Sequence, residues 1–114
     1  MCIRDSDRTY AGRARHPLTV RLQATLRECV LPREAFERLI EANRVDQRVA
    51  RYETWEQLLG YCRLSADPVG ELVLAALGLA SPERVALSNK VCTALQLAEH
   101  WQDVAEDLAR GRCV

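Results

Sequence analysis

The sequence has no excess of charge of either sign, and this limits the partners that it is expected to bind. Its 16 Lys and Arg residues balance its 16 Asp and Glu residues, so the formal net charge is zero. Proteins that bind nucleic acid usually carry a basic excess, because they must neutralise phosphates. We therefore expect no nucleic-acid partner.

Paired cysteines, long apolar runs and glycine-rich loops are also missing. The five cysteines show no C-x-x-C spacing, which argues against a zinc site and a disulfide framework and favours a reducing compartment such as the cytoplasm. No stretch approaches eighteen consecutive apolar residues, so no membrane span is predicted. No glycine-rich phosphate loop or nucleophile pair is visible.

Aromatic residues are few, at one Phe, two Trp and three Tyr, so any core must be aliphatic. Hydrophobic residues make up 48% of the chain, which is typical of a globular protein. Its 114 residues are enough for one small domain with one core.

Strand patterning is absent, since no segment alternates with period two over more than a few residues. Apolar residues recur instead at helical spacing in five stretches. These stretches are 17–28, 32 to about 45, 54 to about 66, 69–79, and 81 to about 110. Because the connections between these stretches are short, the pattern predicts an all-α, antiparallel bundle of about five helices.

Several residues mark where these helices begin and end. Thr54 and Gln57 have the spacing of a capping box, and Ser81 followed by Pro82 is a strong helix start. Gly111 is placed to end the last helix. The last predicted helix is therefore about 28 residues long, which is long for a helix in a globular protein.

The stretch 69–79 is apolar nearly all round, which predicts a central, buried helix. Pro68 precedes it, and a kinked continuous helix or a clean break would both fit there. Gly70 and Gly78 within this stretch suggest close approach of another helix.

Residues 1–9 are polar and have no periodicity, so we expect disorder there. The first six residues also resemble translated sequencing-adapter sequence. We therefore treat 1–9 as a disordered or artefactual leader and 10–114 as the domain.

One face of the last predicted helix carries a column of polar side chains at one-turn spacing: Gln96, Glu99, Asp103, Asp107 and Arg110. Asp103 and Asp107, four residues apart, can converge on one divalent cation, with Glu99 as a third oxygen donor; Mg²⁺ takes such ligands. From spacing alone, a solvated helix face with an ordinary Glu106–Arg110 pair is the better explanation. The opposite face is apolar and is predicted to be buried: Ala94, Leu97, Ala98, Trp101, Val104, Ala105 and Leu108.

Other single residues are expected to have ordinary roles. His100 beside the column is predicted to lie at the surface, and Trp101 in the core. Tyr61 is predicted to be a half-buried packing residue. Asp46 is predicted to be a surface or capping residue.

Two motifs favour the metal-site interpretation over the solvated helix face, because together they resemble the squalene/phytoene synthase family. Asp46, Tyr52 and the run YCRLSADPVG at 61–70 resemble the family segment D…Y-C-x-x-(S/V)-A-x-x-V-G. Residues 95–112 resemble its second aspartate-rich segment, L-Q-x-x-N-x-x-(R/Q)-D-x-x-x-D-x-x-x-G-R. Details such as Trp101-Gln102-Asp103 look most like the bacterial hydroxysqualene synthase branch.

The resemblance implies a partial isoprenoid synthase fold acting on farnesyl-derived diphosphates. In the hydroxysqualene branch the substrate is presqualene diphosphate, which loses diphosphate with help from Mg²⁺ and gives hydroxysqualene for squalene and hopanoid synthesis. The residues that match the family's site fall into three groups: Asp103, Asp107 and Glu99 for metal, Tyr61 and Gln96 for catalysis, and Asp46, Val69 and Arg112 for substrate. Glu99 stands where the family usually has asparagine.

The resemblance also implies missing parts, since no first aspartate-rich motif precedes residue 10. We therefore expect an interior fragment that is inactive alone, from a parent enzyme that is active. Its partners would be an isoprenoid diphosphate and, as open questions, other squalene-pathway enzymes and a peripheral membrane position. The alternative is a non-catalytic helical protein-interaction module.

Overall fold

The computed structural model describes residues 3–111, which form six helices and, within that range, no strand. The helices are α1 (Ile3–Tyr10), α2 (Pro17–Glu28), α3 (Arg33–Asp46), α4 (Trp55–Ser65), α5 (Asp67–Ala76) and α6 (Pro82–Ala109). The predicted all-α class is confirmed, and five of these helices lie where the periodicity predicts them.

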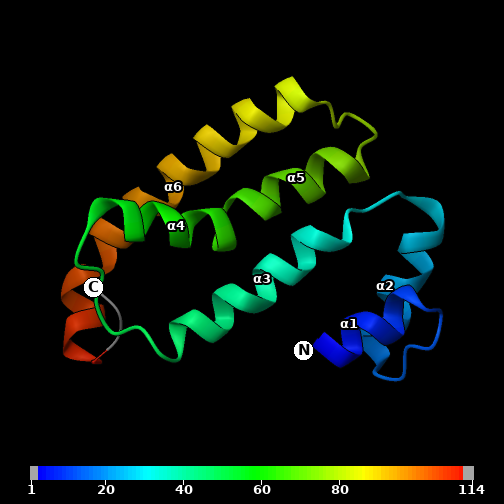
Figure 1. The fold of residues 1–114 in the computed structure, drawn as a ribbon, viewed down its shortest axis with the longest axis horizontal. Coiled ribbons are helices and arrows are strands. Elements are labelled where there is room, and N and C mark those ends of the chain that lie inside the picture. The colour runs from blue at the N-terminus through cyan, green and yellow to red at the C-terminus, as the bar shows by residue number, and fades with distance from the viewer. Residues whose placement is uncertain (1–2, 112–114) are drawn as a thin grey trace.

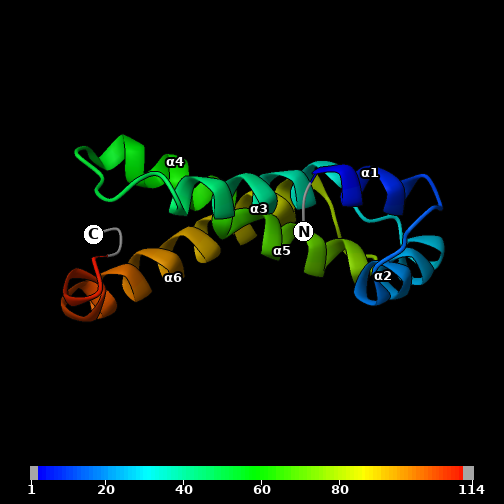
Figure 2. The same cartoon turned by 90° about the horizontal axis from the view of Figure 1, so that it is seen from below.

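Helices α3, α4 with α5, and α6 lie side by side and alternate in direction (Figure 1). Helices α1 and α2 form a separate pair near the start of α3 (Figure 2). The molecule is flat, with extents of 42 × 33 × 19 Å, and its radius of gyration is 15.6 Å. A compact domain of this length would have a radius of gyration of about 13 Å. The flat arrangement therefore leaves whole faces of helices uncovered.

The predicted helix ends are confirmed in detail. The Thr54 hydroxyl accepts from the Gln57 amide N–H at 3.2 Å, and the Gln57 side chain accepts from the Glu53 amide at 2.9 Å. The Ser81 hydroxyl accepts from the Arg84 amide at 3.3 Å, which caps α6. Gly111 has a φ of 65°, in the left-handed region that ends helices at glycine.

Just before Pro68 one helix ends and a new one begins, so the two are not one kinked helix. α4 ends at Ser65 and α5 begins at Asp67, so Ala66 alone separates them. Proline lacks an amide hydrogen, and it is tolerated here because it occupies the first turn of α5.

The expectation of disorder at the N-terminus is wrong for residues 3–9, which belong to α1. Residues 1–2 lie outside the described residues. Helix α1 packs on α2 and α3, and its Ser6 and Thr9 are each only 2% exposed. The Tyr10 hydroxyl donates to the Leu31 carbonyl at 3.3 Å. These tertiary contacts hold in place a segment whose own periodicity is too weak to predict a helix.

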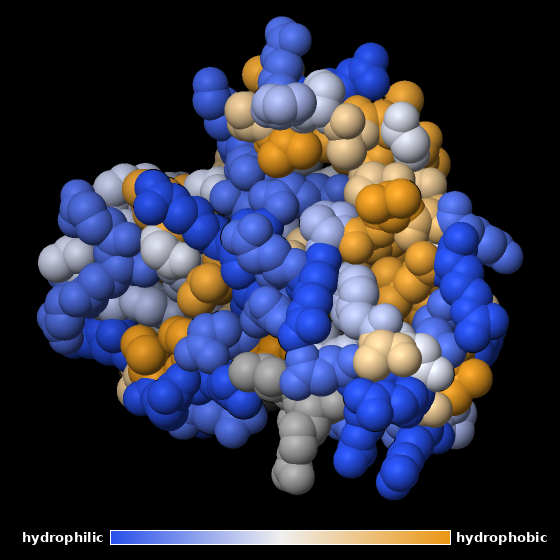
Figure 3. Space-filling model, turned by 45° about the vertical axis from the view of Figure 1, so that its right-hand side comes forward, coloured by the Kyte–Doolittle hydropathy of each residue, from blue (hydrophilic) through white to orange (hydrophobic). Residues whose placement is uncertain are grey.

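The predicted burial of α5 and of the apolar side of α6 is wrong. On α5, Val69 and Val73 are 48% and 53% exposed, and Leu77 at its C-cap is 66% exposed. On α6, Leu97 is buried, but Trp101 and Leu108 are 63% and 66% exposed. Apolar side chains gather visibly on one face of the surface (Figure 3). The reason is that no other element among residues 3–111 covers these sides of the two helices.

Gly70 lets α5 and α6 approach each other closely, as predicted. A Cβ at this position would lie 2.7 Å from Cys92 Sγ and closer still to Ser88 Oγ. Gly78 has a different role from the predicted one. Its φ is 69°, and it ends α5 in a Schellman turn, in which Gly78 and Leu79 donate to the Ala75 and Leu74 carbonyls.

Replacing the two helical glycines Gly70 and Gly60 by alanine should have opposite effects on stability. Gly60→Ala meets no atom within 4 Å and should raise the free energy of unfolding by about 0.5–1 kcal/mol, the usual helix-propensity gain. Gly70→Ala should lower it by about 1–2 kcal/mol, since overpacking outweighs that gain. Chemical denaturation of both variants tests this, and equal effects would contradict the close approach at Gly70. Adding Ser88→Ala to Gly70→Ala should recover part of the loss.

A network of polar side chains joins α3, α5 and α6. Arg38 on α3 pairs with Glu71 on α5 and also donates to the Arg63 carbonyl at 3.3 Å. Glu71 in turn accepts from the Asn89 side chain of α6 at 3.3 Å. One turn away, the Thr93 hydroxyl donates to Asp67 at 2.9 Å.

Asp67 is 6% exposed, and this burial raises the pKa of its carboxyl above the usual range, although the Thr93 hydrogen bond opposes the rise.

None of the helices within residues 3–111 combines the length and the apolar composition that a membrane-spanning helix needs.

Candidate functional site

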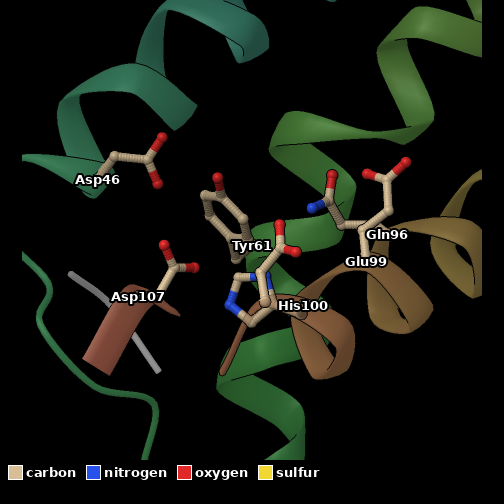
Figure 4. A pocket seen from close by; sticks show the side chains of 7 residues that line it. Asp46, Tyr61, Gln96, Glu99, His100 and Asp107 are labelled. Carbon is tan, nitrogen blue, oxygen red and sulfur yellow. The ribbon is translucent and has the colours of Figure 1, made fainter. Parts of the chain in front are cut away.

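A cavity of about 340 Å³ lies between the end of α3, the middle of α4 and the second half of α6. Its wall is lined by Asp46, Tyr61, Gln96, Glu99, His100, Asp103 and Asp107. Figure 4 shows these side chains in close-up: in this view Tyr61 lies in the centre, with Asp46 and Asp107 on one side and Gln96 and Glu99 on the other.

Helix α6 supplies most of the wall because its polar column repeats once per turn. Gln96, Glu99, Asp103 and Asp107 all line the cavity, as their spacing predicts. The fifth member of the predicted column, Arg110, is not among the lining residues and instead forms an ion pair with Glu106. Four residues of the predicted polar column therefore form one side of the cavity.

The opposite wall comes from residues that are distant in the sequence. Asp46 is the last residue of α3, and Tyr61 lies in the second turn of α4. Helix α4 packs against both α3 and α6, which brings these two residues to the α6 column.

Four of the seven lining residues are carboxylates, and none of the seven is Lys or Arg. Such a cavity attracts cations and repels a free anion. A phosphate group can therefore bind among these seven residues only together with a cation.

Two contacts fix the orientation of the uncharged lining residues. The Ser65 hydroxyl donates to Gln96 Oε1 at 3.4 Å, which ties α4 to α6 at the cavity. The rings of Tyr61 and His100 lie 5.9 Å apart at their centroids, and Tyr52 lies 5.5 Å from Tyr61 and 6.1 Å from His100. Together these three residues form an aromatic trio beside the cavity.

The donor set of the cavity fits Mg²⁺ bound together with a phosphate ligand. Across residues 3–111, no group of three or more His, Cys, Asp or Glu side chains is close enough to enclose a metal ion. Protein-bound Mg²⁺ commonly has only one or two carboxylate ligands and completes its shell with waters and phosphate oxygens. Open carboxylates on one helix suit that binding mode, whereas a metal held by protein ligands alone would need a closed cluster.

Of the residues predicted for substrate binding, Asp46 lines the cavity and Val69 is not among the described lining residues. Val69 lies at the start of α5, 48% exposed, on the uncovered apolar side of that helix. Arg112 lies outside the described residues.

His100 is the lining residue that the sequence analysis missed, since it was expected at the surface. It is four residues after Gln96 and three before Asp103, so helical spacing alone could have placed it on the same side of α6. Trp101 was expected in the core but is 63% exposed; it lines a second groove beside the cavity, with Trp55, Leu58 and Val104.

Comparisons with known proteins agree on one family. Residues 3–114 match the family model described as squalene/phytoene synthase. Among solved structures, the chain is similar to squalene synthase HpnC from Alicyclobacillus acidocaldarius, with a TM-score of 0.92 and 54% identity over 96% of this chain and 42% of that one.

Curated relatives include three hydroxysqualene synthases. The chain is 45% identical to that of Zymomonas mobilis over 60% of this chain and 23% of the relative. It is 36% identical to that of Rhodopseudomonas palustris over 80% of this chain and 31% of the relative. The chain thus spans less than a third of the length of each of these relatives.

Proposed function

Because the chain belongs to the squalene/phytoene synthase family, we propose that a synthase containing it acts on presqualene diphosphate and releases hydroxysqualene, in squalene and hopanoid synthesis. The observation that carries the proposal is the cavity with four carboxylates and no Lys or Arg among its described lining residues. The similarity of the chain to hydroxysqualene synthases supports the choice of substrate.

In this proposal Asp103 and Asp107 hold Mg²⁺, and Glu99 contributes a third carboxylate. All three line the cavity on one face of α6. Mg²⁺ would neutralise the diphosphate and so favour its departure. Glu99 in place of the family's usual asparagine adds one negative charge to the wall, which should strengthen the attraction for cations.

Tyr61 and Gln96 are the proposed catalytic residues. When the carbon–oxygen bond of the substrate breaks, the electron pair leaves with the diphosphate and a carbocation remains until water captures it and releases a proton. The ring face of Tyr61 can stabilise positive charge beside it. Gln96 accepts from Ser65 through Oε1, which leaves its amide group to donate to a ligand in the cavity.

Asp46, Val69 and Arg112 are the proposed substrate contacts. Asp46 lines the cavity opposite α6. Val69 belongs to an exposed apolar stripe with Val73 and Leu77, which would exclude water from a hydrocarbon chain lying on it. Arg112 is proposed to pair with a diphosphate oxygen, for which the guanidinium geometry is suited.

We also propose a cytoplasmic location, with peripheral access to the membrane and to other enzymes of the squalene pathway. The described cysteines Cys29, Cys62 and Cys92 are free thiols, which suits a reducing compartment. The proposed substrate is a lipid, which explains why a membrane surface would be useful.

Titrating the 114-residue chain with inorganic pyrophosphate in a calorimeter tests the proposal. We expect binding when Mg²⁺ is present and none when EDTA removes it, because the carboxylates repel the free anion. Binding that is equally strong without Mg²⁺ would contradict the proposed role of the cavity.

A helical protein-interaction module is the second candidate, and the exposed apolar side chains of α5 and α6 favour it. The same titration separates the two functions. A folded chain that binds no pyrophosphate at any Mg²⁺ concentration would favour the interaction module.

A further inference from the structure

The distance between Asp46 and the carboxylates of α6 is not set by direct contact between the two helices that carry them. Asp46 ends α3 and the other three carboxylates belong to α6, yet within residues 3–111 the helices α3 and α6 do not contact each other. The chain between Asp46 and α4, residues 47–54, contains no helix. This connection carries Tyr52, the member of the aromatic trio that does not lie on a helix.

We propose that Tyr52 and His100 are positioning residues that hold Asp46 and Tyr61 at a set distance from the carboxylates of α6. The inference rests on the proposed function, because it concerns the same cavity. The three rings lie within 6.1 Å of one another, and they come from three different parts of the chain: the connection, α4 and α6. The aromatic trio therefore joins the connection to both α4 and α6.

His100 is placed to act through its ring rather than through a hydrogen bond. Its Nε2 atom is buried and has no hydrogen-bond partner among the described residues. A buried nitrogen without a partner destabilises the fold, so Nε2 itself supplies no stabilising hydrogen bond. The ring, in contrast, contacts both tyrosines and lines the cavity as well as the neighbouring groove.

The test compares variants that keep or remove the ring. His100→Phe keeps an aromatic ring, whereas His100→Ala removes it and loses contacts with both tyrosines. Gln102→Ala is the matched control, because Gln102 is two residues from His100 on the same helix, is exposed, and lines neither the cavity nor the groove. Each variant is titrated with inorganic pyrophosphate and Mg²⁺, and amide hydrogen exchange is followed in residues 47–54.

We expect His100→Ala to weaken Mg²⁺-dependent pyrophosphate binding by roughly tenfold, as is usual when support behind a metal site is lost. Exchange in residues 47–54 should also become roughly tenfold faster, because aromatic pairs anchor that segment. His100→Phe should restore both quantities to the wild-type values, and Gln102→Ala should leave both unchanged.

The two readouts separate the inference from the proposed function. If the wild-type chain binds no pyrophosphate, the proposed function fails, and the exchange rates still decide whether the trio anchors the connection. Equal exchange rates in His100→Ala and the wild type would overturn the inference. So would a His100→Phe variant that behaves like His100→Ala, because the ring would then not be the group that matters.

Discussion

Replacing Asp103 and Asp107 together by alanine lowers the affinity of the chain for pyrophosphate in the presence of Mg²⁺ by on the order of 100-fold or more. Removing groups that only support a metal ligand already costs about 10–100-fold in affinity, so removing two ligands should cost at least that much. Both carboxylates line the cavity on α6. Isothermal titration calorimetry at fixed Mg²⁺ measures the change.

Glu106→Ala is the matched control for this experiment. Glu106 lies on α6 between the two aspartates, but it is paired with Arg110 and is not among the lining residues. It removes one negative charge from the same helix, so it also tests for a general charge effect. If Glu106→Ala weakened binding as much as the aspartate variant, the loss could not be assigned to ligands in the cavity.

Replacing Glu71 by alanine should lower the free energy of unfolding by about 3 kcal/mol. It leaves the Arg38 guanidinium, which is 24% exposed, without its partner on α5; breaking a fully buried ion pair typically costs about 3–5 kcal/mol, and this pair is only partly buried. The lower end applies because Glu34 also lies 3.8 Å from Arg38. A small domain has only about 5–15 kcal/mol of stability in total, so this loss is large. Urea denaturation followed by circular dichroism measures it.

Two further variants show whether the charge pair itself is responsible. Glu106→Gln breaks an exposed pair on α6 and should change stability by less than about 1 kcal/mol. The double variant Arg38→Met/Glu71→Leu should be more stable than Glu71→Ala, since it leaves no unpaired charge inside. A double variant as unstable as Glu71→Ala would show that packing, and not the charge, causes the loss.

The helices of this protein were predictable from sequence because their signals are local. Thr54 with Gln57, and Ser81 with Pro82, satisfy backbone groups within one turn, so each start can be recognised from a few residues. The polar column of α6 is local in the same sense, since residues one turn apart must share a face. Helix α1 could not be predicted in this way, because its order depends on contacts with α2 and α3.

Burial was predicted less well than helices. Periodicity identifies which side of a helix is apolar, but only packing determines whether another element covers that side. Val73 on α5 and Trp101 on α6 belong to apolar sides and are more than half exposed, because no described element lies against them. The role of His100 could not be foreseen for a related reason, since its aromatic partners Tyr52 and Tyr61 come from elsewhere in the chain.

The sequence by itself determined the all-α class, most helix boundaries, and the acidic face of α6 with its Asp103 and Asp107. These features depend on interactions within a few residues, which the order of residues specifies directly. Only the tertiary structure decided that Asp46 and Tyr61 lie against that face, that His100 packs against both Tyr52 and Tyr61, and that the described residues of the wall include no Lys or Arg. The physical reason is that these placements arise from the packing of α4 against both α3 and α6, an interaction between segments that are far apart in the sequence.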